Sequence, residues 1–391
     1  MTKQCRENPI RKAVRTWAEA HVPDEDYPGI AEQLVGTAPK RFTIYEPMVL
    51  LPSASFTHET WTTILSSSSD SSTRSLWRMI LEEISGNEGK RRVTHLAVNE
   101  AIPPVLRSDS DADPGDQSEN VLRSPSGLRM LHGDFGGAEE GAGTGTRDFE
   151  GAFWVRTRQN GILQTWAPRW TMFSRGNVKE KARLLGFPKA PVTDAGERQQ
   201  WAVDLYAGIG YFVFSYASLG MKVLCWEMNA WSVEGLRRGA AANRWGVRVV
   251  SGSELEGMSD AQLVELVRGG GQRITVFLED NQRAAGRVRT LQGAGLVRAV
   301  THVNCGLLPT SEPTWDTAWD MTVHSDEAWL HLHDNVGVDD VQGRSRVLQS
   351  RFEERAAVLS NGRHSRVDHV EKVKTYAPGV WHCVFDIHIT S

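Results

Sequence analysis

The sequence predicts an α/β fold in which a mainly parallel sheet ends in a C-terminal antiparallel hairpin and follows a smaller mixed N-terminal region. From residue 149 onward, strand-like apolar runs alternate with helix-length intervals, as in βαβ units. One run, 201–206, leads into a loop carrying two glycines. The last two runs are separated by Tyr376-Ala-Pro-Gly379, a turn-forming sequence that predicts the hairpin.

The N-terminal third is expected to mix helices and strands. Residues 8–34 are predicted to be rich in helix, and 41–51 carries β-branched and apolar residues typical of strands. The serine-rich segment 66–72 is too polar to pack and is expected to form a loop. The Gly-, Ser-, Asp- and Glu-rich stretch 108–148 is predicted to be a low-complexity linker or insertion without packed structure. The predicted organisation is therefore an N-terminal mixed region (1–107), a linker (108–148) and a main domain (149–391).

The main domain contains a regular succession of predicted elements. Its expected strands are 152–156, 201–206, 222–226, 248–250, 274–278, 299–303, 328–334, 367–375 and 381–389. Helices are expected at 232–244 and 347–359, and another is expected to begin after Asn177, a residue type favoured at N-caps. Ligands of open α/β sheets bind beyond the carboxyl ends of the strands, so the residues that follow each strand are the candidate site.

The composition of the chain limits the kinds of protein that it can be. The 391 residues are enough for two domains, and 40% are hydrophobic, which supports a sizeable core. The net charge of −4 gives no global basic field, so contact with RNA would depend on local Arg and Lys patches. The four cysteines have no C-x-x-C spacing, and neither an 18-residue apolar run nor an apolar N-terminal core is present. We expect an intracellular, cytoplasmic protein without a membrane span or a zinc site.

The stretch around Asp204 predicts a nucleoside-binding βαβ unit. Gly208 and Gly210 follow the strand that ends in Asp204, and glycines let the backbone turn sharply and approach a ligand. Glu227 ends the next strand, close to the spacing of about 20 residues at which an acidic residue accepts the hydroxyls of a ribose. An ordinary strand-to-helix turn is the alternative interpretation of the glycine motif.

The same motif distinguishes between two cofactors. A pyrophosphate-binding loop has the pattern G-x-G-x-x-G, whereas this loop lacks the third glycine and carries Tyr211 and Phe212, which would crowd a pyrophosphate. S-adenosyl-L-methionine (SAM) has no phosphate and fits better. The fold class is therefore predicted to be a class I SAM-dependent methyltransferase-like Rossmann fold.

Two further strand ends carry polar residues suited to recognition. Asp280 and Asn281 follow 274–278 and offer the acceptor and donor that the adenine amino group and ring nitrogen require. Asn304 follows 299–303 and precedes Pro309, which suggests an amide beside the reacting centre. A solvated turn and a turn-capping Asn are the alternative interpretations.

The segment before the glycine motif is rich in groups that bind anions. Ser174 and Arg175, together with Lys179 and Lys181, are suited to hold the carboxylate of a methionine moiety by charge-assisted hydrogen bonds. The alternative interpretation is a solvated basic helix face.

Four motifs in register carry a family resemblance. They are Met172-Phe-Ser-Arg-Gly-Asn177, Asp204-Leu-Tyr-Ala-Gly-Ile-Gly-Tyr-Phe212, Glu227-Met-Asn229 and Asn304-Cys-Gly-Leu-Leu-Pro-Thr-Ser-Glu312. Over roughly 149–391 the chain resembles the tRNA wybutosine-synthesizing protein 2 family, which is related to the tRNA guanosine-37 N1-methyltransferases. One departure is Ala230, where that family usually has Pro; this affects only a helix start.

The resemblance implies a reaction and a set of binding residues. It implies transfer of the 3-amino-3-carboxypropyl group of SAM to the 4-demethylwyosine base at position 37 of tRNA(Phe), in the anticodon loop, with release of methylthioadenosine. Ser174, Lys181, Glu227 and the Asp280-Asn281 pair fall on family positions that contact SAM. We hypothesise that Ser174, Arg175 and Lys181 anchor the aminocarboxypropyl arm while Asn304 and Pro309 line the nucleobase slot, so that Asn304, Pro309 and Arg175 are the candidate catalytic residues.

Two other functions stay open on the sequence alone. A tRNA (guanosine-37) methyltransferase would use the same scaffold and transfer the methyl group, and a SAM- or RNA-binding scaffold would transfer nothing. Leu330-His-Leu-His333 places two histidines on one face of a strand, but no acidic or Cys partner with ligand spacing accompanies them, so we expect no metal site.

Overall fold

The computed structural model describes residues 7–22, 29–87, 92–99, 105–107, 117–119, 128–136, 148–191, 199–358 and 362–391. The chain divides into two compact units. The first comprises Met1–Thr157 and Trp166–Phe173, and the second comprises Arg158–Thr165 and Ser174–Ser391. Most of the predicted linker 108–148 lies outside the described residues, and the boundaries drawn from the sequence stay a prediction.

The first unit is a small α/β body, as the mixed character of its sequence predicts. Its helix α1 begins after Asn8, whose side chain accepts hydrogen bonds from the backbone N–H groups of Ile10 (3.0 Å) and Arg11 (3.3 Å). A four-stranded sheet has the order β1-β2-β3-β6. The elements are α1 (Pro9–His21), α2 (Ile30–Thr37), β1 (Thr43–Tyr45), β2 (Met48–Leu51), α3 (Glu59–Ser67), α4 (Asp70–Asn87), β3 (His95–Asn99), β4 (Val105–Arg107), β5 (Gln117–Glu119) and β6 (Leu128–His132).

The serine-rich segment 66–72 shows how tertiary packing overrides local polarity. We expected a loop, and this was wrong: α3 continues to Ser67 and α4 begins at Asp70. The side chain of Ser69 accepts a hydrogen bond from the N–H of Ser72 (3.2 Å), so serine supports the helix start. Farther along α4, Leu76, Ile80 and Ile84 are completely buried, and this apolar face holds the helix in place.

The strands β7 (Val155–Gln159) and β8 (Ile162–Trp166) form a two-stranded sheet of their own. The strand expected at 152–156 thus starts later than predicted and pairs locally instead of joining the main sheet.

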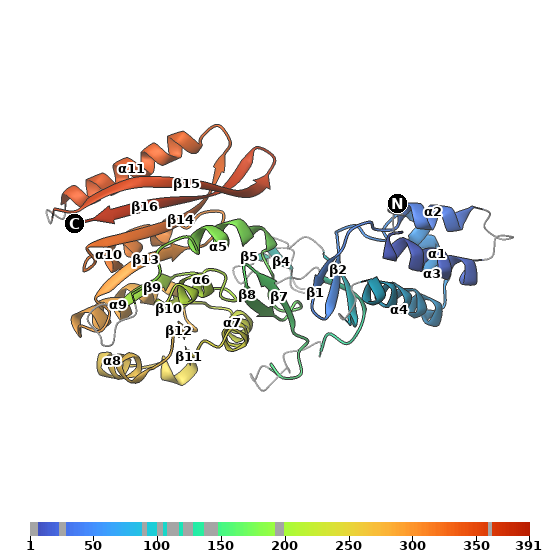
Figure 1. Ribbon diagram of the computed structural model, residues 1–391, viewed down its shortest axis with the longest axis horizontal. Helices are drawn as coiled ribbons and strands as arrows, with labels where there is room; N and C mark the ends of the chain where they lie inside the picture. The colour runs from blue at the N-terminus through green and yellow to red at the C-terminus, as the bar shows by residue number, and fades with distance from the viewer. Residues whose placement is uncertain are drawn as a thin grey trace, which may run out of the picture. The chain divides into compact units, whose positions relative to one another are not determined.

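The second unit is built on an eight-stranded sheet of order β11-β12-β10-β9-β13-β14-β16-β15, visible from bottom to top in Figure 1. The strands from β11 to β14 are parallel, and β14, β16 and β15 pair antiparallel, which confirms the predicted parallel sheet with its C-terminal hairpin. Its elements are η1 (Arg175–Asn177), α5 (Val178–Leu184), β9 (Gln200–Asp204), α6 (Val213–Ser218), β10 (Lys222–Trp226), α7 (Ala230–Ala242), β11 (Val247–Val250), η2 (Gly252–Glu254), α8 (Asp260–Gly269), β12 (Ile274–Phe277), η3 (Asn281–Arg283), α9 (Ala284–Gly293), β13 (Ala299–Cys305), η4 (Glu312–Thr314), α10 (Trp315–Met321), β14 (Glu327–Gly337), α11 (Val341–Val358), β15 (His364–Ala377) and β16 (Val380–Thr390).

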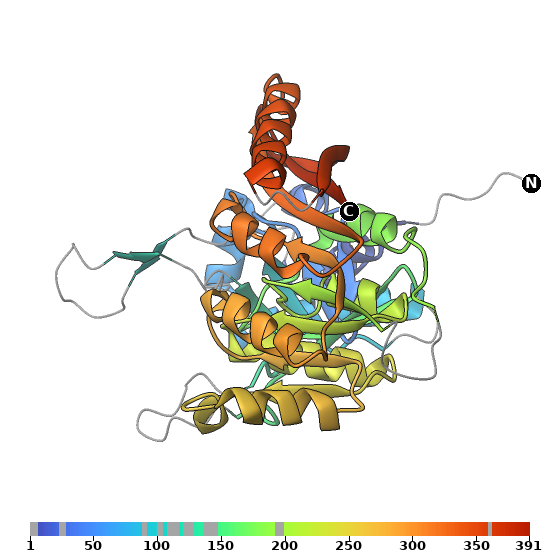
Figure 2. The same cartoon turned by 90° about the vertical axis from the view of Figure 1, so that its left-hand side faces the viewer.

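Both faces of this sheet are covered, and strands such as β10 and β12 are mostly apolar. In β9, Trp201 and Val203 pack into one core with α8, α9, α10 and α11, whereas Ala202 packs into a second core with α5, α6 and α7. Figure 2 shows α8, α9 and α10, coloured yellow to orange, in front of the strands. Continuous apolar runs are the pattern expected of parallel strands buried on two faces.

No helix in the described part of the chain is both long and apolar enough to cross a membrane.

Candidate active site

The sequence-predicted residues gather where β9, flanked by β10 and β13, ends. The chain goes from β9 to β10 on one side and returns to β13 on the other, and such a reversal opens a crevice beyond the strand ends. Two backbone hydrogen bonds hold the first loop there: Leu205 N–H donates to Asn304 O (3.0 Å), and Ala207 N–H donates to Trp226 O (2.9 Å).

The loop after β9 requires both of its glycines. Gly208 has φ +52° and Gly210 has φ +89°, a conformation that side chains other than glycine rarely adopt. A Cβ at Gly208 would lie 2.8 Å from the Tyr211 ring, and one at Gly210 would lie 2.6 Å from the Phe214 ring. Glycine is therefore required at both positions, because the two rings occupy the space that a side chain would need.

Glu227 lies against this loop. Its Oε2 accepts the N–H of Gly208 (2.8 Å), and its Oε1 accepts the N–H of Asn229 (2.8 Å). The side chain is half-buried, and burial raises the pKa of Glu227 although these hydrogen bonds oppose the shift. Each carboxylate oxygen keeps a second lone pair, which suits it to the two hydroxyls of a ribose.

Asp204 and Asn304 form a completely buried pair at the carboxyl ends of β9 and β13. Asp204 Oδ1 accepts the N–H of Tyr206 (3.1 Å) and the Nδ2–H of Asn304 (3.4 Å), while Tyr216 donates its hydroxyl to Asn304 Oδ1 (3.5 Å). The other oxygen, Asp204 Oδ2, is buried and has no hydrogen-bond partner among the described residues. Burial, aided by the nearby charge of Glu227, raises the pKa of Asp204 to about 7.

Ser174 and Lys181 meet at the aromatic residue of the glycine loop. Ser174 N–H donates to the Tyr211 hydroxyl (3.0 Å), and the Lys181 ammonium lies 5.5 Å from the centre of the Tyr211 ring. Lys181 also donates to the side-chain oxygens of Gln159 (2.5 Å) and Gln164 (2.7 Å). Burial lowers the pKa of Lys181 to about 7. Two of the four residues expected to hold a methionine moiety therefore approach the same tyrosine.

Other parts of this segment differ from expectation. Asn177 occupies the N-cap of α5, but its side chain makes no capping hydrogen bond. Lys179 forms an ion pair with Glu371 of β15 and donates to Lys372 O (3.3 Å), so it contacts the hairpin and not Ser174. Arg175 is exposed.

The remaining predicted residues lie at the rim. Asn281 donates its Nδ2–H to Leu205 O (2.8 Å), which ties the end of β12 to the loop after β9, and the exposed Asp280 accepts the N–H of Gln282 (2.8 Å). Pro309 is exposed and follows a cis peptide bond; its carbonyl accepts the N–H of Asn335 (2.8 Å).

Three contributors escaped the sequence-based prediction. Tyr211 looked like an obstacle to a ligand, but its hydroxyl positions Ser174. Tyr216 reaches Asn304 from the interior of α6. Lys374, on β15, donates to Ser174 Oγ (3.3 Å). No local sequence pattern indicates that Lys374 meets Ser174.

The donors and acceptors at the crevice fit SAM. The Glu227 carboxylate suits the hydroxyls of a nucleoside, and the Lys181 ammonium suits a carboxylate.

The two histidines of β14 belong to a polar network beneath this crevice. His331 Nδ1 lies 2.7 Å from Asp386 Oδ1, His302 Nδ1 lies 3.0 Å from His331 Nε2, and His333 Nδ1 lies 2.9 Å from His382 Nε2. Among the residues that the structure describes, no group of three His, Cys, Asp or Glu side chains is arranged to hold a metal ion.

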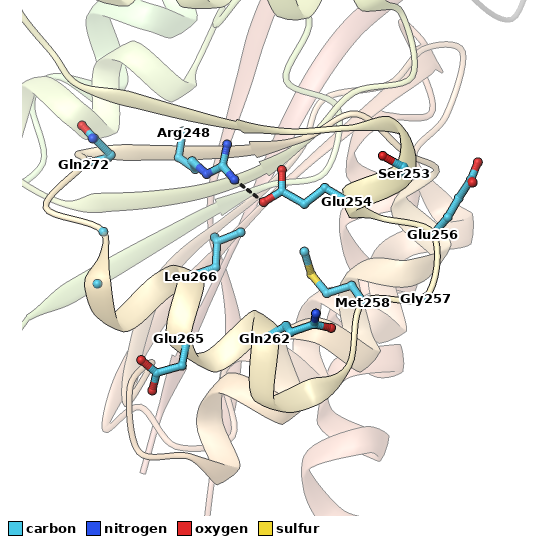
Figure 3. A pocket seen from close by; sticks show the side chains of 12 residues that line it. Arg248, Ser253, Glu254, Glu256, Gly257, Met258, Gln262, Glu265, Leu266 and Gln272 are labelled. Carbon is cyan, nitrogen blue, oxygen red and sulfur yellow. Dashed lines mark hydrogen bonds and ion pairs between the residues drawn. The ribbon is translucent and has the colours of Figure 1, made fainter.

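A separate cavity lies elsewhere in the second unit. A cavity of about 560 Å³ opens between β11 and α8, and Figure 3 shows Arg248 pairing with Glu254 across it beside Met258. None of the sequence-predicted site residues lines it.

Comparisons with known proteins identify relatives of this chain. No family model matches the chain. The protein of Schizosaccharomyces pombe named tRNA wybutosine-synthesizing protein 2 is 38% identical over 368 residues, which cover 94% of this chain and 74% of that protein. The Saccharomyces cerevisiae protein of the same name is 31% identical over 390 residues, covering 91% of this chain and 75% of the relative.

Solved structures share the fold. TYW2 of Pyrococcus horikoshii in complex with MeSAdo superposes with a TM-score of 0.55 over 97% of this chain and 99% of that chain, at 18% identity. The predicted class I SAM-dependent methyltransferase-like fold is thereby confirmed.

Proposed function

The chain belongs to the tRNA wybutosine-synthesizing protein 2 family, and from this premise we propose its reaction and the residues that perform it. The protein is a SAM-dependent transferase of tRNA modification that acts in wybutosine biosynthesis. It transfers the 3-amino-3-carboxypropyl group of SAM to the 4-demethylwyosine base of tRNA(Phe) and releases methylthioadenosine.

SAM supplies a sulfonium that activates three carbons, and orientation decides which of them reacts. Glu227 binds the ribose hydroxyls, supported by its hydrogen bonds to Gly208 and Asn229, which fix its two oxygens. Asp280 and Asn281 bind the adenine edge. The link from Asn281 to Leu205 supports this role, because it holds the end of β12 next to the glycine loop.

The methionine end is held by Ser174 and Lys181. Lys181 is the cation best placed to receive a carboxylate, because glutamine oxygens fix it without adding a competing negative charge. Holding the carboxylate directs the γ-carbon toward the base, and such alignment is worth up to about 7–11 kcal/mol of the barrier.

Asn304, Pro309 and Arg175 are proposed to act at the base-binding end. Asn304 is completely buried and donates a hydrogen bond to Asp204, so in the described arrangement it holds the ends of β9 and β13 together. Pro309 and Arg175 are exposed. We propose that the target is position 37 in the anticodon loop and that the protein acts in the cytoplasm; the absence of C-x-x-C spacing among the cysteines agrees with a reducing compartment.

One observation carries this proposal: Glu227 and Lys181 both contact the glycine loop, Glu227 at Gly208 and Lys181 at Tyr211. The acidic side chain is suited to the nucleoside of SAM, and the cationic side chain is suited to the carboxylate of its methionine arm. The test is incubation with tRNA that bears the tricyclic precursor and with SAM labelled either in the carboxypropyl arm or in the methyl group. Nucleoside mass spectrometry should detect the arm label in the base and methylthioadenosine in solution. Methyl label in the base with S-adenosylhomocysteine would instead identify a methyltransferase, and SAM binding without turnover would identify a scaffold.

A matched pair of variants tests the assignment of the ribose site. Glu227→Gln removes a charged acceptor, which is worth about 1.5–3 kcal/mol, so the KM for SAM should rise by roughly 10- to 100-fold. Glu256→Gln, an exposed residue, should leave KM unchanged. Equal KM values in the two variants would contradict the role of Glu227.

A further inference from the structure

Lys374 of β15 reaches the methionine end of the crevice from an element that the motifs do not include. Its ammonium donates to Ser174 Oγ at 3.3 Å, across 200 residues of sequence. Ser174 in turn donates its N–H to Tyr211 of the glycine loop. A contiguous path of contacts thus runs from the C-terminal hairpin to the loop that approaches the cofactor.

The backbone around Lys374 is shaped to bring the side chain to this place. The pairing of β15 with β16 shifts register between Lys372 and Lys374, and such irregularities re-aim side chains next to functional sites. Gly176 leaves room for the lysine stem, because a Cβ there would lie 2.4 Å from Lys374 Cδ. The approach of Lys374 to Ser174 therefore depends on two specific backbone features.

No acidic side chain among the described residues forms an ion pair with Lys374. The lysine is half-buried, and its ammonium donates to Ser174 Oγ. Burial lowers the pKa of Lys374, and its charge contributes to the lowered pKa of His382. An ammonium group that is partly removed from water and has one uncharged acceptor is stabilised when an anionic ligand binds beside it.

We propose that Lys374 is a second cationic anchor for the carboxylate of the aminocarboxypropyl arm and that it works together with Lys181. The inference rests on the proposed function. One ammonium for each carboxylate oxygen fixes the rotation of the arm, which a single ammonium leaves free. The C-terminal hairpin thus helps decide which carbon of SAM faces the base.

A phosphate of the tRNA backbone is the other anion with suitable chemistry. The carboxylate is favoured because Lys374 donates to Ser174, one of the two residues that we assign to the methionine arm. A phosphate would give Lys374 a role in RNA binding that is independent of SAM.

Calorimetric binding without tRNA separates these possibilities. Three ligands are used: SAM, decarboxylated SAM, which keeps the sulfonium and amine, and methylthioadenosine, which lacks the arm. Lys374→Met should weaken SAM binding by roughly 10- to 100-fold, the range for a hydrogen bond to a charged group. It should not weaken binding of the two ligands without a carboxylate. Lys374→Arg should restore most of the SAM affinity, because it keeps the charge.

Lys372→Met is the matched control, since it removes the same charge from an exposed position of the same strand, and it should change none of the three affinities. Equal weakening of all three ligands by Lys374→Met, or no weakening, would overturn the inference. So would unchanged SAM affinity with weaker binding of tRNA in a filter assay, the result expected of a phosphate contact. Failure of the unaltered protein to prefer SAM over decarboxylated SAM would count against the proposed arm site itself, independently of Lys374.

Discussion

Two buried polar clusters lie in the same sheet. Each contains an aspartate, but only one of the two aspartates is paired with positively charged side chains. In the first, Asp386 pairs with His331 and Arg183, and Arg183 pairs with Glu180 through two hydrogen bonds (2.9 and 2.7 Å). In the second, Asp204 has only neutral hydrogen-bond donors, and one of its oxygens has no partner among the described residues.

The two aspartates accordingly shift in opposite directions. Burial alone would raise the pKa of both carboxyl groups, but His331 and Arg183 hold the pKa of Asp386 at about 2, whereas that of Asp204 rises to about 7. Complete pairing is what a structural network needs, because an unpaired buried charge is costly. An incompletely paired group in the same sheet is a candidate for ligand binding, since a ligand can supply the missing partner.

The largest effect is expected from Asp386→Ala. Removing one member of a buried ion pair leaves Arg183 partly uncompensated, so the free energy of unfolding should fall by about 3–5 kcal/mol at pH 7. Urea unfolding measures this loss. The control is Asp368→Ala, which removes an exposed partner of Arg366 on β15 and should cost no more than about 1 kcal/mol. Similar losses in the two variants would mean that the buried network is not the structural element we describe.

Both clusters also show the limits of sequence-based prediction. The strands of the sheet were predicted because continuous apolar runs and glycine loops are local patterns, and Asp204, Gly208 and Glu227 follow from the spacing within one βαβ unit. The contact of Arg183 with Asp386 joins residues 203 positions apart, and that of Ser174 with Lys374 joins residues 200 apart. Which side chains meet over such separations depends on strand order and on the register shifts of β15, which no local pattern encodes.

Prediction also failed where polar residues support structure. The serines of 66–72 belong largely to helices because the buried face of α4 determines the fold there. Polarity alone therefore misassigned segment 66–72 as a loop, and the buried face of α4 was needed to explain its structure.

A second variant, Asp204→Asn, tests the incompletely paired cluster through pH. The folded protein favours the protonated form of Asp204, so ionisation costs stability as pH rises from about 4 through 7. Asn cannot ionise. The variant should therefore match the unaltered protein at pH 4 and exceed it at pH 8 by on the order of 2–4 kcal/mol, from the size of the shift. Urea unfolding across this pH range, without SAM, makes the measurement. Parallel curves for the two proteins would show that Asp204 is ionised without penalty and that its environment is not what the structure indicates.

The smallest effect is expected from a substitution at the cavity between β11 and α8. This substitution tests whether cavity volume or an incompletely paired buried group is the better indicator of the binding site. The cavity holds about 560 Å³, but Arg248 pairs with Glu254 and both side chains are more than a third exposed. Arg248→Ala should therefore change the free energy of unfolding by no more than about 1 kcal/mol. Its affinity for SAM, measured by calorimetry, should stay within twofold, in contrast to Glu227→Gln. If Arg248→Ala weakened SAM binding by tenfold or more, the cavity would belong to the cofactor site. Volume would then be a better guide in this sheet than the unpartnered oxygen of Asp204.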